Sequence, residues 1–251
     1  MADALFEFLL RQGDNALVLG HRMSEWCGVA PALEEDIALA NTALDLIGQT
    51  QLWLGYAAEV EGSGRSANDL AFRREVYDFK NLLMLEVPSE DFGRTLMRQF
   101  LFDAFQVPWL TALQGSSDQR VADIAAKSVK EALYHLDRSQ ETVVALGDGT
   151  EESNARMQAA LEFLWPYVGE MFADDAVDEA MAEAGVAPLP SSLREAHSAT
   201  VEATLSAAAL TLPEGDFAHK GGRTGFRHTE HLGHMLATMQ ILQRSYPGAT
   251  W

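Results

Sequence analysis

One stretch of the sequence decides the fold: LEEDIALANTALDLIGQTQLWLGYAAEVE at residues 33–61. Its apolar residues recur every three to four positions, which is the spacing of one face of an α-helix. A stop signal, Gly62-Ser-Gly64, follows directly. Between residues 37 and 58 the helix is apolar on nearly all of its faces. A helix of this kind is typical of a protein interior, so we expect it to be central and well buried.

The same periodicity continues on both sides of this segment. Asp91 and Asp118 stand where N-cap residues are expected, and Pro108 lies inside one of the predicted helices. We find neither alternating strand patterns nor a repeat of fixed period. The sequence therefore predicts an all-α protein in which residues 1–251 form a single helical-bundle domain. The predicted long helices span residues 5–26, 33–61, 91–113, 120–146 and 150–172, and the shorter ones span 69–77, 174–184, 191–209 and 229–244.

Composition and charge exclude several classes of protein. The chain has 251 residues, with 18 Lys and Arg against 37 Asp and Glu, a formal net charge of −19. So acidic a chain does not fit a nucleic-acid-binding protein, because phosphate binding needs a basic face. The single cysteine, Cys27, excludes an internal disulfide and a cysteine-based zinc or iron–sulfur site. The sequence has no membrane-length apolar run and carries acids where a signal peptide has Lys or Arg, so we expect a cytoplasmic protein.

Chemistry in a helical bundle is usually built from inward carboxylates and imidazoles. A di-iron site takes a Glu from each of two helices and a Glu-x-x-His pair from each of two others. None of the seven histidines completes such a pair, and Glu131 precedes His135 by four residues, a spacing more typical of ordinary helical neighbours. His228, His231 and His234 can share one helical face, but no fourth ligand is placed, so zinc there competes with helix capping and partner contacts.

Seven segments of the chain resemble one protein family closely. They are LRQGDN at 10–15, SEWCG at 24–28, IALAN at 37–41, LDLIGQ at 44–49, YAAE at 56–59, KEALYH at 130–135 and HTEHLG at 228–233. The family is that of the C subunits of the bacterial phenylacetyl-CoA epoxidase (ring-1,2-monooxygenase) complex. The resemblance runs from about residue 9 to the C-terminal end.

The resemblance implies a ferritin-like fold and a place in a multicomponent enzyme. In that complex a di-iron A subunit epoxidises the aromatic ring of phenylacetyl-CoA with O₂. A flavin and iron–sulfur reductase supplies electrons from NADPH, and a further small subunit is present. The C subunit is a paralogue of the A subunit, pairs with it and is regarded as structural. We therefore expect no catalytic, cofactor-binding or metal-binding residue in this chain, and neither nucleic acid nor a membrane among its partners.

The resemblance also identifies the positions at which the catalytic paralogue holds its metal. Leu46 and Ala132 cannot ligate, and Gln49 replaces a histidine, so too few ligands remain for a di-iron pair. A one-residue shift in the alignment brings in Asp45 or Glu131. The degenerate positions are Glu25, Leu46, Gln49, Asp103, Ala132 and His135.

Two other functions stay open at this point. One is an independent di-iron oxidase, and the other is a homodimeric binding module without a paralogous partner. The iron content of the purified chain separates the oxidase from a structural subunit. The oxidase would use Glu25, Asp45, Asp103, Glu131 and His135.

If the bundle is kept, we expect Glu25, Asp103 and His135 still to point inward. Buried carboxylates without a metal must pair, accept hydrogen bonds or take up protons. We therefore predict a polar cluster in which a protonated His135 offsets Glu25 or Asp103, with Glu131 and Gln49 nearby.

A basic, glycine-rich loop precedes the last predicted helix. It carries Lys220, Arg223 and Arg227 around GGRTG at 221–225. Arginine binds carboxylates and phosphates through two parallel hydrogen bonds, and the start of a helix favours anions. The loop could contact an acidic face of a partner subunit or the phosphates of the acyl-CoA. We favour the partner, because a structural subunit needs docking contacts.

Overall fold

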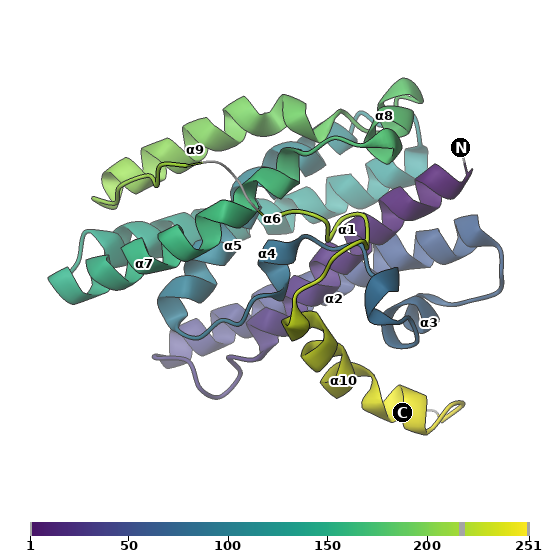
Figure 1. Cartoon of the computed structure of the whole chain (residues 1–251), viewed down its shortest axis with the longest axis horizontal. Coiled ribbons are helices and arrows are strands. Elements are labelled where there is room, and N and C mark those ends of the chain that lie inside the picture. The colour runs from purple at the N-terminus through teal and green to yellow at the C-terminus, as the bar shows by residue number, and fades with distance from the viewer. Residues whose placement is uncertain (1, 216–218, 250–251) are drawn as a thin grey trace. The chain divides into compact units, whose positions relative to one another are not determined.

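The computed structural model describes residues 2–215 and 219–249, and its ribbon consists of helices joined by loops (Figure 1). No β-strand occurs in these residues. The all-α prediction is confirmed, and the helices are consistent with a ferritin-like fold. The helices are α1 Ala2–Ser24, α2 Leu33–Glu61, α3 Ala67–Phe72, α4 Leu83–Glu86, α5 Phe92–Leu113, α6 Gln119–Gly147, α7 Glu151–Val168, α8 Ala176–Glu183, α9 Arg194–Ala207 and α10 Glu230–Ser245, with 3₁₀ turns at Val76–Asp78, Gly169–Phe172 and Pro190–Leu193.

The predicted N-caps are present and explain where the long helices begin. The Asp91 carboxylate accepts from the backbone N–H of Arg94 at 2.7 Å and so caps α5. Asp118 accepts from the N–H of Arg120 at 2.9 Å and caps α6. Each cap satisfies N–H groups that have no partner within their own helix.

One predicted helix is shorter than expected. The helix predicted over 69–77 ends at Phe72, and a 3₁₀ turn follows after a break. The break places Arg74 in the interior, where its guanidinium donates to the Asp14 carboxylate on α1. Tertiary pairing of a buried charge therefore overrides the local helical pattern. The one-turn helix α4 has no counterpart in the prediction.

The chain divides into two compact units. The first combines the residues up to Cys27 with Ile37–Pro88 and the segment from Lys220 onward. The second comprises Gly28–Asp36 and Ser89–His219. The single-domain prediction over 1–251 stays a prediction.

Two glycines allow α1 and α2 to pack closely in the first unit. A β-carbon added to Gly13 would lie 2.5 Å from Leu54 Cδ2, and one added to Gly20 would lie 3.3 Å from Leu46 Cβ. Leu54 is fully buried, so its side chain has little room to move. The two glycines are seven positions apart in the sequence, which places both on nearly the same face of α1.

Helix α2 is buried on one face only. Leu39, Trp53 and Leu54 are at most 1% exposed, whereas Ile37 is 53% and Leu44 69% exposed. The expectation of a helix buried all round is therefore wrong for the isolated chain, because nothing in the described part of the chain covers the second face. Despite this apolar surface, no helix among the described residues is long and apolar enough to cross a bilayer.

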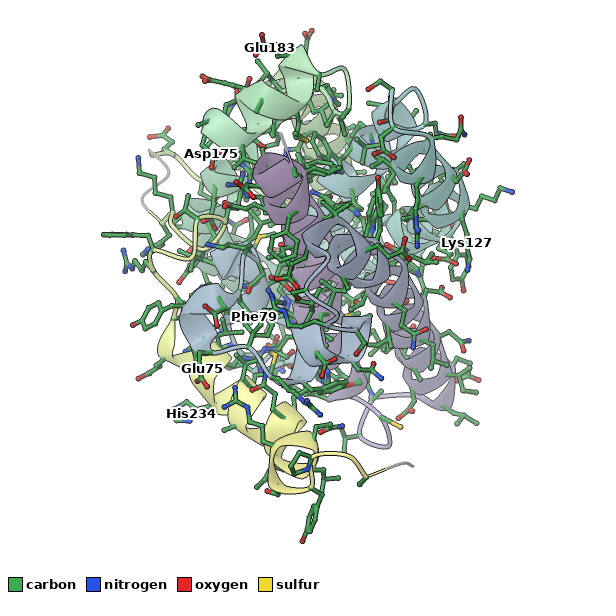
Figure 2. All side chains as sticks on the ribbon, turned by 90° about the vertical axis from the view of Figure 1, so that its right-hand side faces the viewer. Glu75, Phe79, Lys127, Asp175, Glu183 and His234 are labelled. Atoms are coloured by element: carbon green, nitrogen blue, oxygen red, sulfur yellow. The ribbon has the colours of Figure 1, made fainter. Side chains whose placement is uncertain are left out.

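A buried ion pair connects α1 to the segment that follows α3. The Asp14 carboxylate accepts from Arg74 Nη1 at 2.9 Å and from the backbone N–H of Lys80 at 2.8 Å. The Arg74 guanidinium also lies 4.2 Å from the ring centre of Phe79, which Figure 2 labels. Next to Asp14, the Asn15 side chain accepts from the N–H of Leu82 at 2.8 Å.

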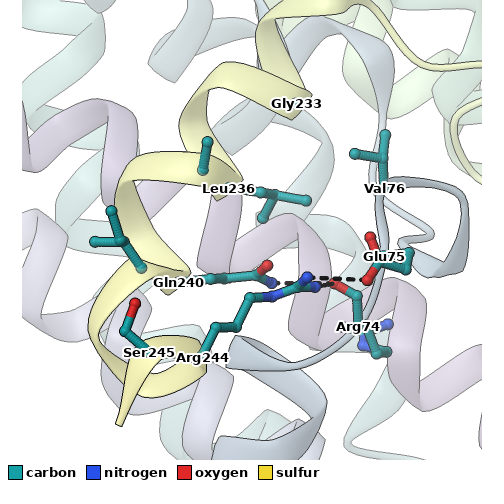
Figure 3. Close-up of a pocket in the computed structure, with 10 residues that line it drawn as sticks. Arg74, Glu75, Val76, Gly233, Leu236, Gln240, Arg244 and Ser245 are labelled. Carbon is teal, nitrogen blue, oxygen red and sulfur yellow. Dashed lines mark hydrogen bonds and ion pairs between the residues drawn. The ribbon is translucent and has the colours of Figure 1, made fainter.

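Helix α10 is held to the same segment by its polar side chains (Figure 3). Gln240 Nε2 donates to the carbonyl oxygen of Arg74 at 3.2 Å. Arg244 donates to the Glu75 carboxylate at 2.9 Å and to the Arg74 carbonyl at 2.8 Å. These contacts satisfy backbone oxygens that the break after α3 leaves without helical partners.

In the second unit the core lies where α5 meets the segment after α7. Phe105 stacks on Trp109 with ring centres 5.7 Å apart, and it meets Phe172 edge-on at 5.6 Å. The three rings are at most 6% exposed. Aromatic pairs of this geometry add to the stabilisation from their burial.

We predict that Gly13→Ala lowers the free energy of unfolding by about 1–3 kcal/mol, because the added methyl overlaps the buried Leu54 side chain. Chemical denaturation measures the change. Gly55→Ala is the matched control, because nothing lies within 4 Å of a β-carbon there. It should leave stability unchanged or raise it by up to about 1 kcal/mol, as helix propensity predicts. Equal effects of the two substitutions would contradict the packing argument.

Candidate functional site

Asp103 lies on α5 in the second unit and is 2% exposed. Its Oδ1 accepts from Gln99 Nε2 at 2.7 Å, and its Oδ2 lies 3.2 Å from Ser139 Oγ on α6. The same Ser139 oxygen lies 3.1 Å from the carbonyl oxygen of Leu136. A hydroxyl has one proton, so Ser139 can donate to Asp103 or to Leu136, but not to both at once. Gln99 and Ser139 are thus the two hydrogen-bonding partners of the buried Asp103 carboxyl group.

Burial raises the pKa of Asp103 well above its usual range, and the hydrogen bonds from Gln99 and Ser139, with the charge of Arg138, oppose the rise only in part. A neutral carboxylic acid in the core avoids the free-energy penalty of an isolated buried charge.

Ala132 and His135 lie on α6, 2% and 3% exposed. The His135 ring meets the ring of Tyr134 edge-on, with centres 6.3 Å apart. The prediction that Asp103 and His135 point inward is thus confirmed. That His135 is protonated and offsets a carboxylate stays a prediction.

Leu46 and Gln49 lie on the buried face of α2, 3% and 2% exposed. Leu46 packs against α1 at Gly20, so its side chain fills a helix–helix contact. At neither position does the structure offer the carboxylate or imidazole that the family resemblance places there in the catalytic paralogue.

Glu25 departs from the expectation. Helix α1 ends at Ser24, and Glu25 lies in the turn that follows. Its carboxylate accepts from Arg22 Nη1 at 2.6 Å, and its side chain is 45% exposed. The prediction that Glu25 points into the core is therefore wrong: the nearby guanidinium holds it at the surface, where its charge stays hydrated and pays no desolvation penalty.

The residues of the alternative oxidase are divided between the two units: Glu25 and Asp45 lie in the first, and Asp103, Glu131 and His135 lie in the second. Asp45 on α2 and Glu131 on α6 are half-buried. Among residues 2–215 and 219–249, no group of three or more His, Cys, Asp and Glu side chains is placed where it could hold a metal ion.

His228 does not share a face with the two histidines that follow it. It precedes α10, and its Nδ1 lies 2.5 Å from Glu86 Oε1 while its Nε2 lies 3.1 Å from the carbonyl oxygen of Phe79. The ring is therefore held from both sides, through one hydrogen-bonding contact at each nitrogen. The predicted three-histidine face is therefore wrong, because tertiary hydrogen bonds remove its first member.

Glu86, which the sequence reasoning missed, is the centre of this cluster. The side chain is fully buried, and it accepts from Asn81 Nδ2 at 2.9 Å and from Thr229 N and Oγ1 at 2.6 and 2.7 Å. A signal exists in the sequence: Glu86 is the one charged residue in the apolar run LLMLEV at 82–87. A lone acid in such a run must find donors in the interior.

His231 and His234 lie on α10 and face a cavity of about 460 Å³ in the first unit, which His21 and Glu25 also line. Burial, followed by the positive charge of Arg22, lowers the pKa of His21. The two α10 histidines thus line this cavity, whereas His228 is bonded to the buried Glu86.

The basic loop lies in the first unit, beside the segment that leads into α4. Lys220 and Arg227 are exposed and Arg223 is half-buried. Lys80 Nζ donates to the carbonyl oxygen of Thr224 at 2.8 Å and fixes the middle of the loop.

The chain matches known proteins over its whole length. The model of the family described as phenylacetic acid catabolic protein covers residues 1–251. A relative from Escherichia coli (strain K12), the C subunit of 1,2-phenylacetyl-CoA epoxidase, is 47% identical over 247 residues, which is 98% of this chain and 99% of the relative. Both matches agree with the resemblance that the seven sequence motifs carry.

We predict that Asp103→Asn changes the pH dependence of stability. A folded-state pKa above the ordinary value means that the folded protein binds more protons than the unfolded one between those two values, so stability falls as pH rises there. The loss is about 1.4 kcal/mol per pH unit within that window. Asparagine cannot titrate, so the variant should gain in melting temperature relative to the wild type as pH rises from about 4.5 toward 8. Asp123→Asn, on the exposed face of α6, is the control. Parallel curves for Asp103→Asn and the wild type would count against a buried neutral acid.

Proposed function

Since this chain belongs to the family of phenylacetic acid catabolic proteins, we propose that it is the structural, non-catalytic C subunit of a phenylacetyl-CoA epoxidase. The family and the E. coli relative together support a role in phenylacetate catabolism. Two finer statements belong to the proposal. The lack of a metal centre is argued from this chain's own residues, and the pairing with a di-iron paralogue is argued from the family resemblance and from the exposed face of α2.

The donor set at the degenerate positions is the observation that carries the proposal. A di-iron pair in a helical bundle takes four carboxylates and two imidazoles. Here Leu46 and Ala132 have no donor atom, and Gln49 offers an amide that does not carry the charge needed to balance two cations. Glu25 is engaged with Arg22 at the surface. The residues present do not fit a di-iron pair.

The second face of α2 supports pairing with another helical chain. Ile37 and Leu44 recur at helical spacing on this face, and both are more than half exposed. Gly48 and Gly55 continue the same face, and nothing lies within 4 Å of a β-carbon at either. A helix that is apolar all round is expected to be covered on both sides, and the glycines leave room for a partner helix to approach.

In this proposal the chemistry belongs to the partners. The di-iron centre lies in the catalytic A subunit, a flavin and iron–sulfur reductase delivers electrons from NADPH, and the complex includes a further small subunit. The present chain keeps the A subunit in shape through a shared interface. Stable interfaces bury well over about 1,000 Å².

We predict that the purified chain retains well below one iron atom after anaerobic loading with Fe(II) and desalting. Elemental analysis gives the iron content, and the A subunit treated in the same way is the positive control. About two iron atoms per chain, as a di-iron bundle holds, together with a di-iron optical band would overturn the proposal and favour the independent oxidase.

We predict that Ile37→Ser weakens binding to the A subunit by about tenfold or more, because central apolar residues dominate interface energetics. Ile241→Ser on α10 is the matched control: Ile241 is 59% exposed against 53% for Ile37. The free energy of unfolding of both variants should lie within about 0.5 kcal/mol of the wild-type value, since neither side chain is buried. Titration calorimetry with the purified A subunit measures affinity, and equal affinities for the two variants would remove α2 from the interface.

A further inference from the structure

The basic loop, residues 220–227, presents an aromatic side chain to solvent. Phe226 is 86% exposed, more than any other large apolar side chain in the described part of the chain. Lys220 and Arg227 beside it are exposed as well. Tyr77, 69% exposed, lies next to the loop, since a β-carbon on Gly225 would be 2.6 Å from the Tyr77 carbonyl oxygen. The result is an aromatic and cationic surface on a chain whose net charge is −19.

Packing holds this loop in one conformation. Gly222 is buried against the backbone of Asn81, and a β-carbon there would lie 3.1 Å from the N–H nitrogen of Leu83. Gly225 has a φ of +69°, which favours glycine. The carbonyl oxygen of Gly221 accepts from the N–H of Phe226 at 3.1 Å and from Thr224 Oγ1 at 2.9 Å.

The end of the loop is fixed as firmly as its middle. His228 and Thr229 follow Arg227 directly, and both bond to the buried Glu86 carboxylate. Phe226 is therefore only two residues from a buried charged anchor. A loop that is already ordered loses little conformational entropy when a partner binds, so more of its contact energy appears as affinity.

We propose that the basic loop docks on another protein chain, with Phe226 entering an apolar pocket whose rim carries carboxylates for Lys220 and Arg227. This rests on the proposed function, which supplies the catalytic A subunit as the partner. Aromatic residues and arginine are the residue types that most often dominate protein interfaces. Lysine and arginine at the rim increase the association rate with an acidic surface.

The shape of the loop favours a protein over a small ligand. Small-molecule sites are concave and enclose most of the ligand surface, whereas Phe226 protrudes into solvent. Charge opposes a second copy of this chain as the partner, because two molecules of net charge −19 repel at long range.

The test uses the full-length chain and the purified A subunit, with affinity measured by titration calorimetry at low and high salt. The variants are Phe226→Ala and Arg227→Glu. Lys127→Glu is the charge control, an exposed lysine on α6 that Figure 2 labels, and Tyr246→Ala, 62% exposed, is the aromatic control. We expect both loop variants to bind at least tenfold more weakly, Arg227→Glu to reduce the salt dependence, and both controls to stay within twofold. Melting temperatures should not change.

Each other outcome overturns the docking proposal. Unchanged affinity of both loop variants, in a wild-type chain that pairs normally, removes the loop from the interface and leaves the proposed function standing. A wild-type chain that does not pair at all overturns both. A raised Michaelis constant for phenylacetyl-CoA at unchanged pairing assigns the loop to the phosphates of the acyl-CoA. Loss of self-association, seen by light scattering, with pairing intact assigns it to a second copy.

Discussion

The first unit depends on supplying hydrogen-bond donors to two buried carboxylates, those of Asp14 and Glu86. A buried negative charge is tolerated only when several donors surround it. Asp14 finds them in Arg74 and the Lys80 amide, and Glu86 finds them in the segment just before α10. The segment between α3 and α4 and the segment just before α10 are both held in place by their bonds to these two groups.

The same two carboxylates explain why two of the family motifs contain none of the degenerate metal-ligand positions. The motif LRQGDN contains Gly13, whose missing side chain lets α2 pack closely against α1. It also contains Asp14, which accepts hydrogen bonds from Arg74. The motif HTEHLG begins with His228 and Thr229, the two residues that bond to Glu86. In these two segments, the residues shared with the family are those that the buried Asp14 and Glu86 carboxylates need around them. The resemblance is therefore compatible with a chain whose metal ligands have been replaced.

The long helices could be predicted because their signals are local. Apolar periodicity and the caps at Asp91 and Asp118 lie within a few residues of the helices they define. That Leu46 and Ala132 cannot bind a metal could also be predicted, since the absence of donor atoms in their side chains is known from the sequence. The failures share a different cause: His228 was misassigned because its partner is 142 residues away, and the exposed face of α2 depends on what the rest of the chain leaves uncovered.

The three-part construction of the first unit has a consequence for synthesis on the ribosome. Its first two segments, which include Glu86 and the Asn81 donor, emerge before Ser89–His219, but His228 and Thr229, which also bond to Glu86, emerge only afterwards. Until then the Glu86 carboxylate lacks most of the hydrogen-bond partners that its burial requires. Nearly all of the second unit is one continuous stretch, which can collapse while the polypeptide is still growing. The C-terminal segment is therefore the last part of the first unit to pack. A nascent chain stalled near residue 219 would have a folded second unit and an incomplete first unit.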